Sequence, residues 1–98
     1  MADEYYNIEL EEGVYFVQWG SKPGWCSTYI IEITRIEENK MWYKILDNLK
    51  NSKSPWPAGE IPTTTDAFKY RALRIEKIID EKHLKRLKME YKLENGGK

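Results

Sequence analysis

The chain carries few side chains that could work together as a nucleophile and a base. Cys26 is its only cysteine and His83 its only histidine. Nucleophilic catalysis by Cys26 needs a general base within hydrogen-bond reach, and His83 is the only imidazole available for that role. The acid pairs at 11–12 and 37–38 fall in predicted turns, where solvated charge is the ordinary explanation. We therefore expect a non-enzymatic protein with no catalytic residue.

Ligands for metals and phosphates are equally sparse. A single cysteine excludes a thiolate-rich metal site, and a tetrahedral zinc site would need carboxylates beside the one histidine. The glycines do not fit the spacing of a phosphate-binding loop, as Gly13, Gly20 and Gly24 illustrate. The sequence predicts neither a metal site nor a cofactor.

Aromatic side chains are the most abundant residues capable of specific binding, at 13% of the chain. Aromatic rings stack on bases or on one another and attract cations to their faces. The candidate members of a binding cluster are Trp19, Trp25, Tyr29, Trp42 and Tyr43. Two explanations stay open: an aromatic cage or stacking platform, and a hydrophobic core with incidental exposure.

A tryptophan between two prolines marks a second candidate site. Flanking prolines stiffen the chain and keep it out of helix and sheet. In Pro55-Trp56-Pro57, Trp56 either plugs its own loop onto the core or projects outward as an anchor for a partner.

Basic residues gather in the second half of the chain. Residues 1–49 hold nine acids and four bases, and residues 50–98 hold seven acids and twelve bases. Two explanations stay open: the acidic and basic halves attract each other on folding, or the basic half faces a polyanion. The candidate basic surface consists of Lys69, Arg71, Arg74, Lys82, Lys85, Arg86 and Lys88. A solvated helix face is the alternative explanation.

Size and composition limit the protein class. With 98 residues, 41% hydrophobic and 33% charged, the chain predicts one domain over 1–98 that is neither disordered nor a membrane protein. The acidic start of the chain lacks the apolar region of a secretory signal, so a cytoplasmic location is expected. The zero net charge argues against nonspecific nucleic-acid binding.

Alternating apolar residues predict the strands that must position these side chains. A β core is expected over 13–46, with a strand at 14–19, a hairpin over 28–46 and a polar turn at 37–40. Asn39 suits a left-handed position in that turn. One face of the strand at 14–19 should remain exposed. A first strand is expected at 5–10.

The rest of the chain has a different pattern. Residues 47–66 contain three prolines and predict a loop or arm, and residues 68–75 predict a returning strand. A basic amphipathic helix is expected over 80–93, followed by a frayed tail at 95–98. Asp80 serves as its N-cap, Ile79 and Leu84 fit a hydrophobic staple, and the apolar stripe is Leu84, Leu87 and Tyr91.

The middle of the chain resembles SH3-like barrels, in particular the Tudor-like branch. Trp25, the strand at 29–33 and the strand at 43–47 follow the order that these barrels use: an aromatic residue, an alternating strand, a turn and a second strand ending in an acid. The resemblance covers residues 13–48 and implies an aromatic binding site. The fold class is mainly β with a C-terminal α-helix, as a small barrel or a strongly curved sheet, with an α+β sheet-plus-helix as the alternative.

These observations predict a protein-binding module, an inhibitor or adaptor encoded by a phage or mobile element, that docks on a larger protein partner. The alternative is nucleic-acid or nucleotide binding by aromatic stacking together with Lys and Arg contacts. The predicted partner-binding residues are Trp19, Trp25, Tyr29, Trp42, Tyr43 and Trp56.

Overall fold

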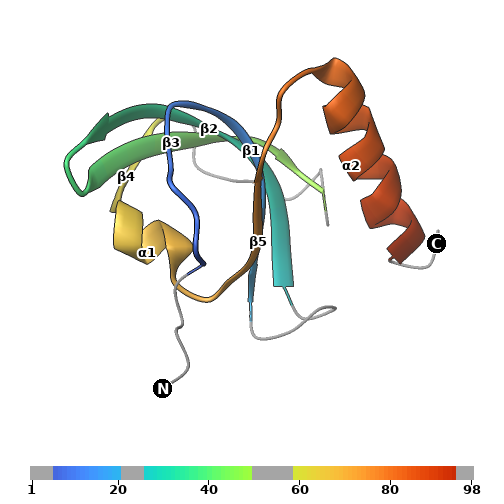
Figure 1. Ribbon diagram of the computed structural model, residues 1–98, viewed down its shortest axis with the longest axis horizontal. Helices are drawn as coiled ribbons and strands as arrows, with labels where there is room; N and C mark the ends of the chain where they lie inside the picture. Colours follow the sequence, from blue (N-terminus) through green and yellow to red (C-terminus); the bar gives the residue numbers. More distant parts are fainter. Residues whose placement is uncertain (1–5, 21–25, 50–58, 95–98) are drawn as a thin grey trace.

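A five-stranded antiparallel sheet forms the body of the chain, and two helices flank it (Figure 1). The computed structural model describes residues 6–20, 26–49 and 59–94. The elements, in chain order, are β1 (Gly13–Gly20), β2 (Cys26–Glu37), β3 (Lys40–Asn48), β4 (Ile61–Thr64), α1 (Thr65–Lys69), β5 (Ala72–Lys77) and α2 (Glu81–Glu94).

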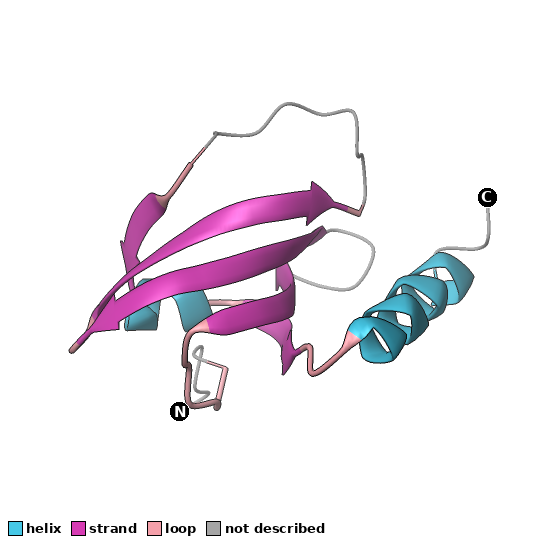
Figure 2. Cartoon of the chain, turned by 90° about the horizontal axis from the view of Figure 1, so that it is seen from above, coloured by secondary structure: helices cyan, strands magenta, loops and turns pink. Residues whose placement is uncertain are grey.

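The strand order across the sheet is β4-β3-β2-β1-β5. The first four strands follow one another as a meander, and β5 returns to pair with β1. Within the described residues the edge strands β4 and β5 do not pair with each other, so the sheet is curved but not closed into a barrel (Figure 2). The predicted class, mainly β with a C-terminal helix, is confirmed in its curved-sheet form.

The central hairpin of β2 and β3 is confirmed, with a tighter turn than the sequence predicted. Glu37 pairs with Lys40, which leaves only two residues in the turn. Glu38 adopts the positive φ, at 56°, and Asn39 does not. The assignment of the left-handed position to Asn39 was therefore wrong.

A β-bulge at Thr34 changes which face the end of β2 presents. Ile33 pairs with Tyr43 and Arg35 pairs with Trp42, so Thr34 is the extra residue. Its hydroxyl donates to the carbonyl oxygen of Trp42 at 3.2 Å. Past the bulge the alternation is reversed, and Ile36 packs on the face opposite to the one that strict alternation predicted.

The sheet is buried on both faces, around two separate cores. The first core lies under α1 and the N-terminal segment and consists of Tyr15, Val17, Ile31, Ile33, Met41, Phe68 and Ile75. The second lies under α2 and consists of Phe16, Ile30 and Leu87. Because both faces of β1 are covered, the expectation that one of them remains exposed was wrong.

Residues 6–11 are not a strand, contrary to the prediction for 5–10. The backbone–backbone hydrogen bond that the structure records between this segment and the rest of the fold runs from the Tyr6 N–H to the Lys69 carbonyl, at 3.0 Å. Tyr6, Ile8 and Leu10 nevertheless pack against the first core. The alternation in this segment reflects one-sided packing without a strand ladder.

The region expected to be a loop and then a strand contains three short elements. Strand β4 pairs with β3 from Ile61 to Thr64 and lies within the expected arm at 47–66. Helix α1 then places Phe68 in the first core, where a strand at 68–75 was predicted. Only the second half of that prediction is confirmed, as the beginning of β5.

Helix α2 begins after Asp80, as predicted, and docks on the second core. The Asp80 carboxylate accepts the His83 N–H at 2.8 Å. Leu84, Leu87 and Tyr91 face the sheet, which confirms the apolar stripe. Ile79 is 77% exposed, so the predicted staple with Leu84 does not form. None of the described helices is long and apolar enough to cross a membrane.

A polar network joins α2 to β5 beside this core. The Arg74 guanidinium donates to Glu76 at 2.6 Å and lies 3.6 Å from a carboxylate oxygen of Glu90. The Ile79 N–H donates to His83 Nδ1, so the ring proton sits on Nε2 and donates to Glu76 at 2.6 Å. The network therefore fixes both the start and the middle of α2.

Candidate binding site: an aromatic pocket

Three strands bring aromatic side chains to one end of the first core. Trp19 lies near the end of β1, Tyr29 on β2 and Tyr43 on β3. All three occupy alternating positions that face the first core. The sequence predicted these three as members of one cluster, and the structure brings them together.

Helix α1 closes the other side of this aromatic cluster. The Thr64 hydroxyl caps the helix by accepting the Ala67 N–H at 3.1 Å, and Asp66 in the first turn favours the helix N-terminus. The single turn that follows directs Phe68 into the core and leaves Tyr70 40% exposed.

The rings pack on one another at the distances typical of aromatic pairs. The ring centroid of Trp19 lies 5.1 Å from that of Phe68, 5.7 Å from that of Tyr29 and 6.2 Å from that of Tyr43. Tyr43 and Phe68 are 5.3 Å apart, in an edge-to-face arrangement. The walls of the site are thus mutually braced.

One hydrogen bond holds the central ring. The Trp19 indole N–H donates to the carbonyl oxygen of Phe68 at 2.6 Å. This bond joins the end of β1 to α1 across a large separation in the sequence. It also satisfies the only polar atom of the indole, while the ring itself packs against Tyr29, Tyr43 and Phe68.

A hollow of about 220 Å³ opens between these side chains. It is smaller than the roughly 300–1,000 Å³ of typical small-molecule sites. None of its lining residues carries a charge at neutral pH; they are Trp19, Tyr43, Thr63, Ala67, Phe68 and Tyr70. The hollow is small and largely open to solvent.

Burial raises the pKa of the Tyr43 phenol. Desolvation, with a smaller contribution from the neighbouring Tyr29, raises the pKa of Tyr43 above its ordinary value of 10.0. Tyr43 therefore presents a neutral hydroxyl group to the pocket.

Trp42 belongs to a different surface, so its predicted place in the cluster was wrong. It points to the opposite face of β3, where the Arg35 guanidinium lies 3.8 Å from its ring centroid. Pro62 pairs with it on the edge strand β4. Trp25 and Trp56, the other two predicted tryptophans, lie outside the described residues.

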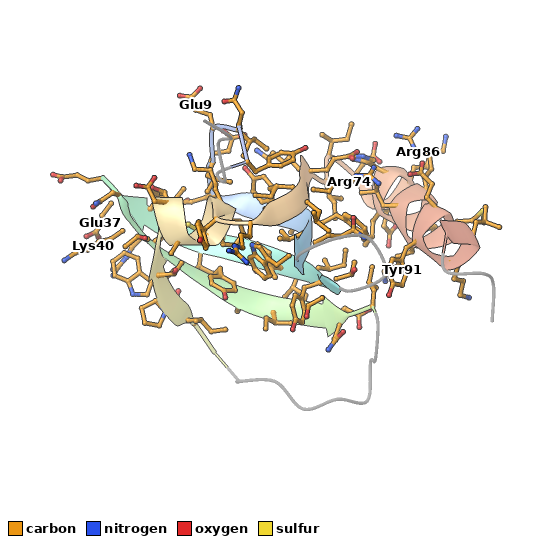
Figure 3. The ribbon with its side chains drawn as sticks, turned by 90° about the horizontal axis from the view of Figure 1, so that it is seen from below. Glu9, Glu37, Lys40, Arg74, Arg86 and Tyr91 are labelled. Atoms are coloured by element: carbon orange, nitrogen blue, oxygen red, sulfur yellow. The ribbon has the colours of Figure 1, made fainter. Side chains whose placement is uncertain are left out.

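The predicted basic surface does not form one patch. Arg74 is drawn into the network with Glu76 and Glu90, between β5 and α2 (Figure 3). The Arg71 guanidinium lies 5.4 Å from the Tyr70 ring centroid, and Lys69 reaches the carbonyl of Ile8 at 3.5 Å.

The helical members of the group differ among themselves. Lys88 pairs with Asp47 at 3.7 Å. Lys82, Lys85 and Arg86 project into solvent from the outer side of α2. Of the predicted group, Lys82 and Lys85 are the helical members with no ion pair to another described side chain, and Arg86 lies 3.9 Å from Glu90.

Sequence reasoning missed Phe68 and Tyr70 as pocket residues. It assigned them to one face of a strand, whereas a helical turn places Phe68 inside and Tyr70 at the mouth. The signal that could have revealed the turn is Thr64 followed by Asp66, a helix N-cap with an acid in the first turn.

No group of three or more His, Cys, Asp or Glu side chains within the described parts of the chain is arranged to hold a metal ion. Comparison with known proteins finds no matching family model, no matching curated protein and no matching solved structure.

Proposed function

We propose that this protein is a non-enzymatic protein-binding module that takes one side chain of a partner into the aromatic pocket. The observation that carries this proposal is a hollow sized for a single side chain and walled by braced rings. Such pockets are where interface anchors bury most effectively. The guest is an uncharged or cationic side chain, because no lining residue carries a charge and the walls offer hydroxyl groups as well as rings.

Tyr70 at the mouth supports this function. It is a large ring left 40% exposed beside an open hollow, whereas the other rings in the described parts of the chain are at least partly buried. A guest side chain would cover it and remove its apolar surface from water.

Nucleic-acid binding draws less support from the same surface. Base stacking needs an open ring face, and the Trp42 ring is covered by Arg35. Trp19 and Tyr43 pack against other rings, and the pocket lining carries no cation to meet a phosphate.

The test is a selection of short peptides from a random displayed library on the immobilised protein. Binding of the enriched peptides is then measured on the variant Ala67→Leu, which fills the hollow from α1 without removing a wall. We expect Ala67→Leu to weaken binding by about tenfold or more.

Leu46→Ala is the matched control, because Leu46 on β3 is an exposed apolar residue like Ala67 but does not line the hollow. It should leave binding unchanged. Enriched peptides that bind a folded Ala67→Leu variant as tightly as the unmodified protein would place the binding site elsewhere. Tighter binding of single-stranded oligonucleotides than of any peptide would favour the nucleic-acid function.

Three further features belong to the same proposal. The module acts in the cytoplasm as a small inhibitor or adaptor on a larger protein, and it is encoded by a phage or mobile element. Its relationship to SH3-like and Tudor-like barrels rests on the pattern of residues 13–48. The combination of a curved sheet with an aromatic pocket is compatible with that relationship.

A further inference from the structure

Helix α2 has an outer side that the fold does not use. Its inner side packs Leu84, Leu87 and Tyr91 on the second core. On the outer side, Met89 is 65% and Leu93 is 72% exposed. Exposed large apolar side chains that lie together on one element mark interaction sites more often than isolated ones.

The outer residues form a single stripe. Lys82, Arg86, Met89 and Leu93 follow the i, i+4, i+7, i+11 spacing that lines one side of a helix, over a length of about 16 Å. The stripe thus has a cationic half followed by an apolar half. Figure 3 shows Arg86 projecting from α2.

A second apolar group adjoins the cationic half. Ile79, which precedes the helix, lines a hollow of about 320 Å³ together with Asp80, Lys82, His83 and Arg86. Asp80 is engaged as the helix N-cap and His83 by Glu76. The two cations of the stripe therefore stand between exposed Ile79 at one end and Met89 with Leu93 at the other.

These cations have little internal compensation. Among the side chains that the structure describes, Lys82, Lys85 and Lys92 have no ion-pair partner. Arg86 lies 3.9 Å from Glu90, which is shared with Arg74. The other acids on the helix lie at its two ends, Glu81 in the first turn and Glu94 at the last residue.

The order of cationic and apolar side chains along the stripe favours one kind of binding partner over the others. An anionic membrane surface would attract Lys82 and Arg86, but its binding also depends on buried apolar area, and only Ile79, Met89 and Leu93 supply it here. A phosphate backbone would pair with the cations and leave the three apolar side chains in water. A protein segment with carboxylates between apolar residues satisfies both parts of the stripe.

We propose that the outer stripe of α2, from Ile79 to Leu93, docks an acidic segment of a protein partner whose carboxylates meet Lys82 and Arg86 and whose apolar side chains cover Met89 and Leu93. This surface is separate from the aromatic pocket, because the pocket lies at α1 and the stripe lies on α2, at the other end of the sheet (Figure 1). The protein then has two docking surfaces.

The test measures four probes on the whole protein at physiological salt. They are a helical peptide in which leucines flank a pair of glutamates, a scrambled peptide of the same composition, duplex DNA, and vesicles of phosphatidylserine with phosphatidylcholine. Two double variants remove the charges and the apolar contacts separately: Lys82→Gln with Arg86→Gln, and Met89→Gln with Leu93→Gln. Lys40→Gln with Lys44→Gln is the matched charge control on β3.

We expect the patterned peptide to bind more tightly than the other three probes. Each helix double variant should weaken its binding by about tenfold, and the β3 control should leave it unchanged. Circular dichroism establishes that all three variants fold. Glutamine favours helix nearly as well as the residues it replaces, so α2 is retained.

Several results would overturn the proposal. They are no binding of the patterned peptide, equal binding of the scrambled peptide, tighter binding of DNA or vesicles, and full binding by a folded Met89→Gln, Leu93→Gln variant. The Ala67→Leu variant separates this proposal from the proposal of a binding pocket. Filling the pocket should leave binding of the patterned peptide at α2 unchanged.

Discussion

Trp19 links the sheet to the pocket more directly than any other side chain described here. Its ring contacts Tyr29, Tyr43 and Phe68, and its N–H donates to the Phe68 carbonyl. A single residue thus fixes the distance between β1 and α1. The same residue forms one wall of the hollow, so the proposed binding depends on a ring that also supports the fold.

Tyr43 should make the fold sensitive to high pH. Burial raises its pKa above 10.0 in the folded chain, so the unfolded chain releases this proton first. The free energy of unfolding should therefore be undiminished below pH 10 and should fall as the pH rises through the folded pKa. Urea denaturation between pH 8 and pH 12 checks this, and Tyr43→Phe should show a shallower fall than the unmodified protein.

Glu76 should have the opposite effect, in acid. Burial alone would raise its pKa, but hydrogen bonds from Arg74 and His83 outweigh it and hold the pKa below 4.5. The carboxylate then stabilises the fold above pH 4.5, and this contribution is lost as the pH falls through the lowered pKa. Thermal melts at successive pH values should show a smaller loss in acid for Glu76→Gln; an identical slope would contradict the role of this network.

At the scale of the elements, α1 is short and depends on its cap. A helix of five residues has little intrinsic stability, and the Thr64 hydroxyl satisfies one of its free N–H groups. Thr64→Ala should lower the free energy of unfolding by about 1 kcal/mol and weaken binding of pocket-selected peptides. Thr64→Ser retains the hydroxyl and should restore both; equal losses in the two variants would rule out the cap as the cause.

Helix α2 is held by one dominant apolar contact. Leu87 is 1% exposed and packs on Phe16 and Ile30. Leu87→Ala should lower the free energy of unfolding by about 2–5 kcal/mol, because truncation leaves a cavity in the second core. The exposed neighbour Met89→Ala should cost far less, and similar losses for both would mean that α2 does not dock as described.

The elements with a clear period were predictable from the sequence. Alternation marked β1 and the hairpin, and the spacing of Leu84, Leu87 and Tyr91 marked α2. Asp80 as its N-cap was also foreseen. These signals are strong because one face of each element is apolar over several repeats.

The elements that carry the pocket were not predictable in the same way. Helix α1 is too short to show a helical period, and β4 contains Pro62, which disfavours an interior strand but is tolerated at an edge. The bulge at Thr34 depends on cross-strand register, which no local pattern encodes. As a result Trp19, Tyr29 and Tyr43 were foreseen as neighbours, while Phe68 and Tyr70 were missed.

At the scale of the molecule, the charge difference between the halves is partly used inside the fold. Lys77 pairs with Glu11, and Lys88 pairs with Asp47, so bases of the second half meet acids of the first. This supports the attraction between the halves that the sequence left open. The basic residues on the outer side of α2 are not paired with acids of the first half of the chain.

The whole molecule therefore presents two surfaces of different chemistry. The pocket is uncharged and sized for one side chain, and the α2 stripe is cationic and apolar. They stand at opposite ends of the sheet, which lets one partner span the molecule or two partners bind together (Figure 1). This arrangement suits an adaptor or inhibitor that needs specificity from a small domain.

The central claim is that a partner side chain enters the aromatic pocket, and the Trp19 indole N–H is the most direct reporter of it. This proton is bonded to the Phe68 carbonyl beside the hollow, whereas Trp42 lies on the opposite face. Two-dimensional ¹H–¹⁵N NMR during titration with a library-selected peptide should shift the Trp19 indole signal and leave that of Trp42 in place. A saturated complex in which the Trp19 signal does not move would contradict the account.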